Sequence, residues 1–248
     1  MKIPKIPRSI IPNSFTAFNI FSGFASMIMS AAGKFEEAVL LILIAAVCDA
    51  LDGLLARLTK STSQFGVELD SLADVVSFGA APSLLIYHAH LYTYDVMGII
   101  LSAFPIVFGA LRLARFNVQL DGFDKTVFSG LPIPFAAITL SAFIYVYNDP
   151  IIGLTPPFHD LLIPLVLFIS LMMVSKIKYE TLPKLTPAGV KEKPHIFIYV
   201  LISAVALILT NGDAVFMVLF FAIFFGVLRH IFTNFFFERE EKLKNNLE

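Results

Sequence analysis

The sequence predicts an all-α integral membrane protein, a bundle of about eight transmembrane helices with both termini in the cytoplasm. Hydrophobic residues make up 57% of the 248 residues, and the mean hydropathy is +0.81. The apolar residues form successive runs of about 20, the length that crosses the hydrocarbon core of a bilayer as an α-helix. The basic residues are also concentrated in alternate loops, which is typical of membrane proteins.

The expected helices follow from the apolar runs. Turn signals separate them, among them 32–34, the polar residues 61–63 and the proline-rich stretch 148–157. The predicted helices are 15–33, 36–59, 66–90, 95–117, 131–147, 158–175, 195–211 and 213–233.

The lysines and arginines indicate how these helices cross the membrane. When the loops are assigned alternately to the two sides, all but one of the 18 basic residues fall on the side of the N-terminus, and Lys34 is the exception. Cytoplasmic loops carry the basic excess in membrane proteins, so both termini are expected in the cytoplasm and the chain in the cytoplasmic membrane. The net charge is −1 and no basic patch dominates, which argues against a nucleic-acid partner and leaves membrane lipids as the expected surroundings.

Four aspartates stand out in the second and third predicted helices. Asp49 and Asp52 lie in the second helix, and Asp70 and Asp74 lie in the third. One ionised side chain at the bilayer centre costs roughly 2.5–3.5 kcal/mol on insertion scales, so four unpaired aspartates would cost on the order of 10 kcal/mol. A bound cation would offset this cost, and a metal site is therefore the first hypothesis.

Helical spacing combines these aspartates with small residues. Residues three, four and seven apart share a helix face. Two such stripes are present: Asp49, Asp52, Gly53 and Ala56 on the second helix, and Gly66, Asp70 and Asp74 on the third. At about 1.5 Å per residue, Asp49 and Asp74 lie roughly 12–14 Å from the connecting turn, and the other two aspartates lie roughly 6–9 Å from it. We expect each pair to meet in the cytoplasmic half of the membrane.

The donor atoms indicate which cations would bind. Oxygen ligands select hard cations such as Mg²⁺, Mn²⁺ or Ca²⁺. Four carboxylates exceed what one Mg²⁺ usually takes from a protein, so the sequence favours two metals that share ligands, an arrangement that clamps phosphate oxygens. A structural ion-pair cluster with Arg57, Arg112 and Arg115 is the alternative.

The acidic stretch also carries a complete motif, D-x-x-D-G-x-x-A-R-x8-G-x-x-x-D-x-x-x-D, from Asp49 to Asp74. The motif resembles the signature of the CDP-alcohol phosphatidyltransferase family. The resemblance implies that the four aspartates bind two divalent cations that hold the pyrophosphate of a CDP-lipid, with Asp74 also acting as general base. It further implies a CDP-lipid site shaped by the motif residues Asp52, Gly53, Ala56, Arg57 and Gly66.

Other stretches resemble the phosphatidylserine synthase branch of that family: 12–19, 109–117, 128–134 and 174–179. This resemblance implies that Thr16 and Asn19 contact the CDP-lipid and that Arg112, Arg115 and Asn117 bind serine. Arginine suits the latter role because it binds a carboxylate bidentately. The alternatives are hydrogen bonding between helices for the first pair and contact with lipid headgroups for the arginines.

The resemblance covers about residues 12–180 and implies a division of the chain. The predicted segments are an N-terminal cytoplasmic or interfacial segment 1–14, a six-helix core 15–180, a cytoplasmic loop 181–194, two additional transmembrane helices in 195–233 and a charged cytoplasmic tail 234–248. The resemblance also suggests a homodimer.

The expected reaction is attack of the L-serine hydroxyl on the β-phosphorus of CDP-diacylglycerol or CDP-archaeol, giving phosphatidylserine or its ether analogue and CMP. The nearest alternative is the same chemistry with glycerol phosphate or inositol phosphate as acceptor. A cation transporter that uses membrane aspartates is an alternative from another class, although no inverted repeat is evident. A protein that binds CDP-lipid without releasing CMP is a third.

Overall fold

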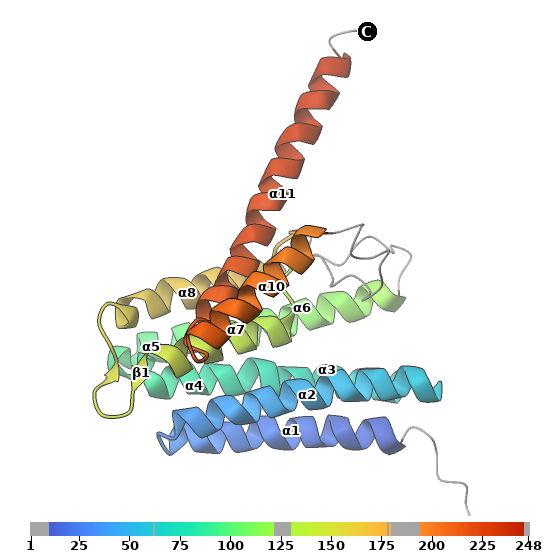
Figure 1. The fold of residues 1–248 in the computed structure, drawn as a ribbon. Coiled ribbons are helices and arrows are strands. Elements are labelled where there is room, and N and C mark those ends of the chain that lie inside the picture. The colour runs from blue at the N-terminus through green and yellow to red at the C-terminus, as the bar shows by residue number, and fades with distance from the viewer. Residues whose placement is uncertain (1–9, 62, 122–129, 178, 180–193, 246–248) are drawn as a thin grey trace, which may run out of the picture. The chain divides into compact units, whose positions relative to one another are not determined.

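The computed structural model describes residues 10–61, 63–121, 130–177, 179 and 194–245. Within these residues the chain is helical apart from turns and one short β-hairpin (Figure 1). The chain divides into two compact units. The first unit comprises Met1–Lys125 and Pro132–Val174, and the second comprises Thr126–Leu131 and Ser175–Glu248.

The first unit holds most of the predicted core. Its elements are α1 (Ile10–Ala31), α2 (Phe35–Thr59), α3 (Gln64–Asp74), the π-helical turn η1 (Val75–Ala80), α4 (Ala81–Ala89), the 3₁₀ turn η2 (Leu91–Tyr94), α5 (Asp95–Ser102), α6 (Phe104–Asp121), α7 (Ile133–Tyr147), β1 (Asn148–Asp149), β2 (Gly153–Leu154) and α8 (Phe158–Val174). The second unit contains α10 (Pro194–Leu209) and α11 (Val215–Asn245).

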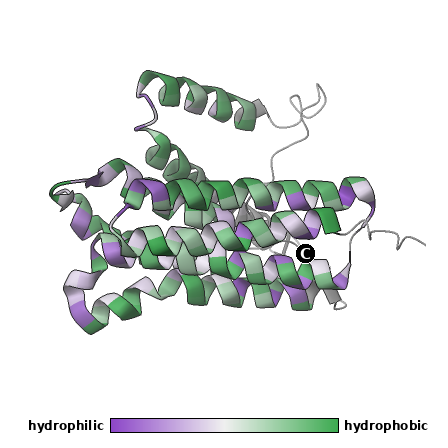
Figure 2. Cartoon of the chain, turned by 90° about the horizontal axis from the view of Figure 1, so that it is seen from below, coloured by the Kyte–Doolittle hydropathy of each residue, from purple (hydrophilic) through white to green (hydrophobic). Residues whose placement is uncertain are grey.

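Five described helical stretches are long and apolar enough to cross a membrane: Ile10–Ala31, Phe35–Thr59, Gln64–Ala89, Leu91–Val118 and Val215–Thr233. Three shorter apolar helices are Ile133–Tyr147, Phe158–Val174 and Ile196–Leu209. Hydrophobic residues cover most of the helices (Figure 2). The prediction of an all-α, multi-pass membrane protein is thereby confirmed, while the number of eight crossings and their orientation stay predictions.

Helices α1 and α2 pack side by side along their lengths (Figure 1). The buried face of α1 is a polar stripe of small side chains at helical spacing: Thr16, Asn19, Ser22, Ser26 and Ser30. Ser26 Oγ donates a hydrogen bond of 2.8 Å to the carbonyl oxygen of Ala38 in α2. Small interfacial residues let membrane helices approach closely, and such hydroxyl bonds hold them in register.

The third predicted helix forms as a continuous helical stretch from Gln64 to Ala89, but it is not a uniform α-helix. Ser63 caps its start, since its side chain accepts a hydrogen bond of 3.1 Å from the Gly66 amide. The π-helical turn η1 then lies between α3 and α4. The fourth predicted helix is also divided, at Ala103, because Pro105 is accommodated best in the first turn of a new helix.

Helices α7 and α8 are joined by a β-hairpin that the sequence analysis did not predict. In it Asn148 pairs with Leu154, and Asp149 pairs with Gly153. Asp149 Oδ1 accepts hydrogen bonds from the amides of Ile151 and Ile152, and these two bonds hold the pKa of Asp149 below its usual range. Strands of two residues are too short to leave a pattern of alternating hydrophobicity.

The first and last helices extend beyond their predicted limits. Helix α1 begins at Ile10 rather than at residue 15, because a proline such as Pro12 is tolerated in the first turn of a helix. Helix α11 continues to Asn245 rather than ending at 233, since the Glu, Lys and Arg residues there are good helix formers. Residues 1–9 of the predicted N-terminal segment, most of the loop 181–194 and residues 246–248 of the tail lie outside the described residues, and the domain boundaries stay a prediction.

In the second unit, the aromatic ring of Tyr179 packs against α11 at Gly226, where an added Cβ would lie 2.7 Å from the ring. Burial raises the pKa of Tyr179 to about 12. The Ile177 carbonyl oxygen accepts a hydrogen bond of 2.8 Å from the Gly130 amide, and Tyr199 donates one to the Val218 carbonyl, which joins α10 to α11.

Candidate active site

Three of the four predicted aspartates lie in one cluster. Asp49 comes from α2, and Asp70 and Asp74 come from consecutive turns of α3. One carboxylate oxygen of each lies within 4.8 Å of those of the other two. Asp74 is the most buried of the three, with 8% of its surface exposed. The i, i+4 spacing in α3 turns both of its aspartates toward α2, as the sequence analysis predicts.

Asp52 is not a member of this cluster. It follows Asp49 by three residues, which moves it about 4.5 Å along α2. Its side chain is 5% exposed and faces a neighbouring pocket that Asp70 also lines. The cluster and the pocket therefore meet at Asp70, and the predicted role of Asp52 as a metal ligand stays a prediction.

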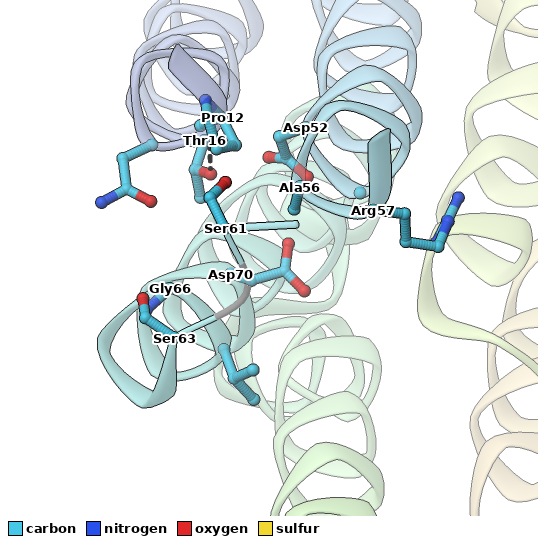
Figure 3. Close-up of a pocket in the computed structure, with 12 residues that line it drawn as sticks. Pro12, Thr16, Asp52, Ala56, Arg57, Ser61, Ser63, Gly66 and Asp70 are labelled. Carbon is cyan, nitrogen blue, oxygen red and sulfur yellow. Dashed lines mark hydrogen bonds between the residues drawn. The ribbon is translucent and has the colours of Figure 1, made fainter. Parts of the chain in front are cut away.

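The pocket has a volume of about 190 Å³ and lies between α1, α2 and α3, beside the turn that joins α2 to α3 (Figure 3). The carboxylates of Asp52 and Asp70 extend into it from α2 and α3 (Figure 3). Six predicted CDP-lipid residues line it: Thr16, Asp52, Gly53, Ala56, Arg57 and Gly66. The structure thus brings together predicted CDP-lipid residues that are separated by up to 50 positions in the sequence.

Two glycines keep the pocket open. An added Cβ at Gly66 would lie 3.2 Å from Ser63 Oγ and 3.6 Å from Asn13 Oδ1. At Gly53 an added Cβ would meet only Arg57 Nη1, at 3.6 Å. A side chain at either position would therefore occupy space that is open to a ligand.

The pocket has five lining residues that the sequence analysis did not single out: Pro12, Asn13, Ser61, Ser63 and Val67. Pro12 and Asn13 belong to the stretch 12–19 that resembles the family, and the two serines lie in the predicted turn after α2. The sequence therefore pointed to both segments, although not to these residues.

Asn19, by contrast, is predicted as a CDP-lipid contact but is not among the lining residues. It is fully buried, and both of its amide atoms lack a hydrogen-bond partner.

The three predicted serine-binding residues of α6 differ in their surroundings. Arg112 interacts electrostatically with Asp74, and its Nε is buried without a hydrogen-bond partner. Asn117 Nδ2 donates a bond of 3.0 Å to Ser71 Oγ in α3, while its Oδ1 is buried and has no partner. Arg115 Nη1 donates a bond of 3.2 Å to the carbonyl oxygen of Val174, the last residue of α8. Arg115 thus supports the end of a helix.

The acidic residues fit divalent metal ions. Asp52 Oδ2 and Asp74 Oδ1 are buried and have no hydrogen-bond partner. A buried carboxylate oxygen without a partner is costly, and coordination to a cation would satisfy it. The donors are all carboxylate oxygens, which favours Mg²⁺, Mn²⁺ or Ca²⁺ over softer metals.

The fold and the site define a multi-pass membrane protein with a buried carboxylate cluster beside a polar pocket. Comparison with known proteins adds the family. The sequence model for CDP-alcohol phosphatidyltransferase matches residues 9–177. The chain belongs to the CDP-alcohol phosphatidyltransferase family, and it is an enzyme, a transferase of phospholipid biosynthesis.

Curated relatives in bacteria and archaea are similar over most of the chain. A Helicobacter pylori protein named CDP-diacylglycerol–serine O-phosphatidyltransferase is 36% identical over 93% of this chain and 94% of its own. A Methanocaldococcus jannaschii protein of the same name is 33% identical over 89% of this chain and 94% of its own. A Methanothermobacter thermautotrophicus protein named archaetidylserine synthase is 38% identical over 68% of this chain and 69% of its own.

Proposed function

We propose that this enzyme transfers the phosphatidyl group of a CDP-activated lipid to the hydroxyl of L-serine and releases CMP. The observation that carries the proposal is the junction of the carboxylate cluster with the motif-lined pocket at Asp70. The names of the relatives support serine as acceptor and both CDP-diacylglycerol and CDP-archaeol as candidate donors.

The pocket is the proposed site of the CDP-lipid head. Thr16 and the glycines line it, with the Arg57 side chain on its wall. Arg57 supplies a positive charge for a pyrophosphate. Asn19 lies one helical turn beyond Thr16 and remains a proposed contact.

Asp49, Asp70 and Asp74 would hold divalent cations, Mg²⁺ or Mn²⁺, with Asp52 completing a two-metal site. When bound, these ions supply positive charge that neutralises the pyrophosphate and stabilises CMP as a leaving group. Ca²⁺ satisfies the same donor set.

Asp74 is the proposed general base. Its carboxylate accepts the proton of the serine hydroxyl, the serine oxygen forms the new bond to the β-phosphorus, and the bond from that phosphorus to CMP breaks. Positioning and charge stabilisation carry most of the catalysis in phosphoryl transfer, so no covalent enzyme intermediate is required.

The serine site is proposed at α6. A serine zwitterion needs a donor for its carboxylate and an acceptor for its ammonium group. Arg112 Nε is a hydrogen-bond donor and Asn117 Oδ1 is an acceptor, and both atoms are buried without a hydrogen-bond partner. Arg112 also interacts with Asp74, so this site adjoins the proposed base. Arg115, bonded to Val174, orients the end of α6.

The whole enzyme is proposed to be a homodimer in the cytoplasmic membrane with eight crossings, both termini in the cytoplasm and the active site open to the cytoplasm. The asymmetry of the basic residues supports this orientation.

The test is CMP release by the purified enzyme from CDP-diacylglycerol or CDP-archaeol with Mn²⁺ or Mg²⁺. The reaction is run with L-serine, glycerol 3-phosphate, inositol phosphate or no acceptor, and with EDTA as the metal-free control. We expect release that requires both serine and metal. Release with another alcohol alone would overturn the acceptor, and release with CDP-archaeol alone would identify an ether-lipid donor. A folded enzyme that releases no CMP from either donor would contradict the proposal, and Mn²⁺ flux into vesicles would then indicate a transporter.

A further inference from the structure

The π-helical turn η1 begins directly after Asp74. Its six residues, Val75–Ala80, interrupt an otherwise α-helical stretch, and the Ala81 amide donates to the carbonyl oxygen of Val76, five residues back. Turns of this kind are rare and occur mostly as single bulges inside α-helices, frequently at functional sites. The bulge here separates the half of the helix that carries Asp70 and Asp74 from the half that packs in the core.

Pro82 explains why the helix widens at this point. Proline has no amide proton, and its ring collides with the carbonyl group four residues before it in a regular α-helix. For Pro82 that carbonyl belongs to Phe78, in the middle of η1. A π-helical turn moves the Phe78 carbonyl away from the ring and transfers the hydrogen bonding to the five-residue spacing.

The extra residue changes the rotation of one half of the helix relative to the other. One inserted residue rotates the two halves by about 100° relative to each other. Before and in the turn, Ala73 and Ser77 are buried, four residues apart. Within the turn, Ser77, Phe78 and Gly79 are buried in succession, and after it Pro82, Ile86 and Ala89 are buried. The bulge therefore lies where the helix is packed on more than one side, so its neighbours fix the rotation between the two halves.

The turn is fixed to its neighbours on two sides. Ser77 Oγ donates a bond of 2.9 Å to the Asn19 carbonyl oxygen in α1, and Gly23 of α1 is so close that an added Cβ would lie 2.3 Å from Ser77 Oγ. On the other side, an added Cβ at Gly79 would lie 3.3 Å from Ile106 Cα in α6. The rotation of α3 relative to α4 is thus held by close backbone contacts.

We propose that this π-helical turn, set by Pro82, is a positioning device that keeps Asp70 and Asp74 turned toward Asp49. Without the extra residue, α3 would rotate by about 100° relative to α4 and carry both carboxylates out of the cluster. Pro82 is then a positioning residue that acts on the metal site from two helical turns away. Of the two measurements that test this inference, only CMP release rests on the proposed function.

The experiment compares Pro82→Ala with the matched control Pro164→Ala in the full-length enzyme. Pro164 also lies inside a helix, α8, but outside the pocket and the aspartate cluster. Two quantities are measured: the Mn²⁺ concentration that gives half of the maximal thermal stabilisation, and kcat and KM for CMP release. Mutation of a residue that orients metal ligands typically lowers metal affinity or activity 10–100-fold. For Pro82→Ala we expect about a tenfold higher Mn²⁺ midpoint and about a tenfold lower kcat, with metal-free unfolding still cooperative.

Pro164→Ala is expected to keep the wild-type Mn²⁺ midpoint and kcat. An unchanged Mn²⁺ midpoint in Pro82→Ala would overturn the inference, and so would a Pro82→Ala variant that no longer unfolds cooperatively, because the proline would then serve the fold as a whole. If the wild-type enzyme releases no CMP, the proposed function fails, while the Mn²⁺ midpoints still decide the inference.

Discussion

At the scale of single residues, the three aspartates of the cluster differ in their surroundings, and we expect them to differ in their roles. Asp74 is the most buried, carries an oxygen without a hydrogen-bond partner and interacts with Arg112. We expect Asp74→Asn to abolish CMP release, because an amide cannot accept the serine proton, while leaving some binding of CDP-lipid. Turnover and binding of CDP-lipid are measured side by side. Asp95→Asn, at the exposed start of α5, is the control with wild-type turnover. Wild-type turnover in Asp74→Asn would refute its role as base.

The two arginines of α6 give a second prediction at this scale. Arg112→Gln removes a buried donor that has no protein partner, so we expect the KM for serine to rise about tenfold or more, the cost of one charge-assisted hydrogen bond. Arg115→Gln loses its bond to the Val174 carbonyl instead. We expect it to lower the unfolding temperature and leave the KM for serine unchanged. Steady-state kinetics and thermal unfolding of both variants check this, and the reverse assignment of effects would contradict the proposed serine site.

The sequence predicts that aspartates of two helices lie close together, but not how the four of them are grouped. The motif spacing places Asp49, Asp70 and Asp74 on facing stripes, and the structure brings them together. Whether Asp52 faces the cluster or the pocket depends on the rotation of α2 against α3, which spacing alone does not fix. The partners of Asn117 and Arg115 come from α3 and α8, so they follow from the tertiary packing and leave no local signal.

At the scale of helices, the close approach of α1 to the π-helical turn gives a prediction about stability. An added Cβ at Gly23 would lie 2.6 Å from the Ser77 Cα, a backbone atom that cannot move aside cheaply. We expect Gly23→Ala to lower the free energy of unfolding by about 1–3 kcal/mol, as overpacking usually does. Gly53→Ala is the comparison, since its Cβ would meet only the end of the Arg57 side chain.

Because alanine also favours the helix, Gly53→Ala is expected to be at least as stable as the wild type. Denaturant unfolding in detergent micelles compares the two variants. A Gly23→Ala variant as stable as Gly53→Ala would show that α1 and the π-helical turn can separate without cost, contrary to the packing described above.

The sequence predicts where the long helices lie, but it does not predict where they are interrupted. Runs of about 20 apolar residues predict the spans because the bilayer demands that length. Pro82 and Pro105 were visible signals for the π-helical turn and for the break at Ala103, but a proline near a helix start and a proline that widens a helix look alike in sequence. The hairpin at 148–154 depends on backbone pairing of only four residues.

At the scale of the whole molecule, the distribution of charge along the chain predicts the orientation. Lys34 lies in the exposed turn between α1 and α2, and Lys60 ends α2 at the opposite end. The lone free cysteine, Cys48, is buried and is replaced by alanine to give a background without thiols. Single cysteines are then introduced as Lys34→Cys or Lys60→Cys, and intact cells are treated with a maleimide that does not cross membranes.

Because the basic residues accumulate on the side of Lys60, we expect the cysteine at position 34 to react in intact cells and the cysteine at position 60 to react only after permeabilisation. The pocket adjoins Lys60 through Ser61, so the same result would place its opening on the cytoplasmic side, as proposed. Reaction of position 60 in intact cells would reverse the orientation and require the site to face away from the cytoplasm. Reaction at both positions would show that α2 does not cross the membrane, which would contradict the predicted bundle.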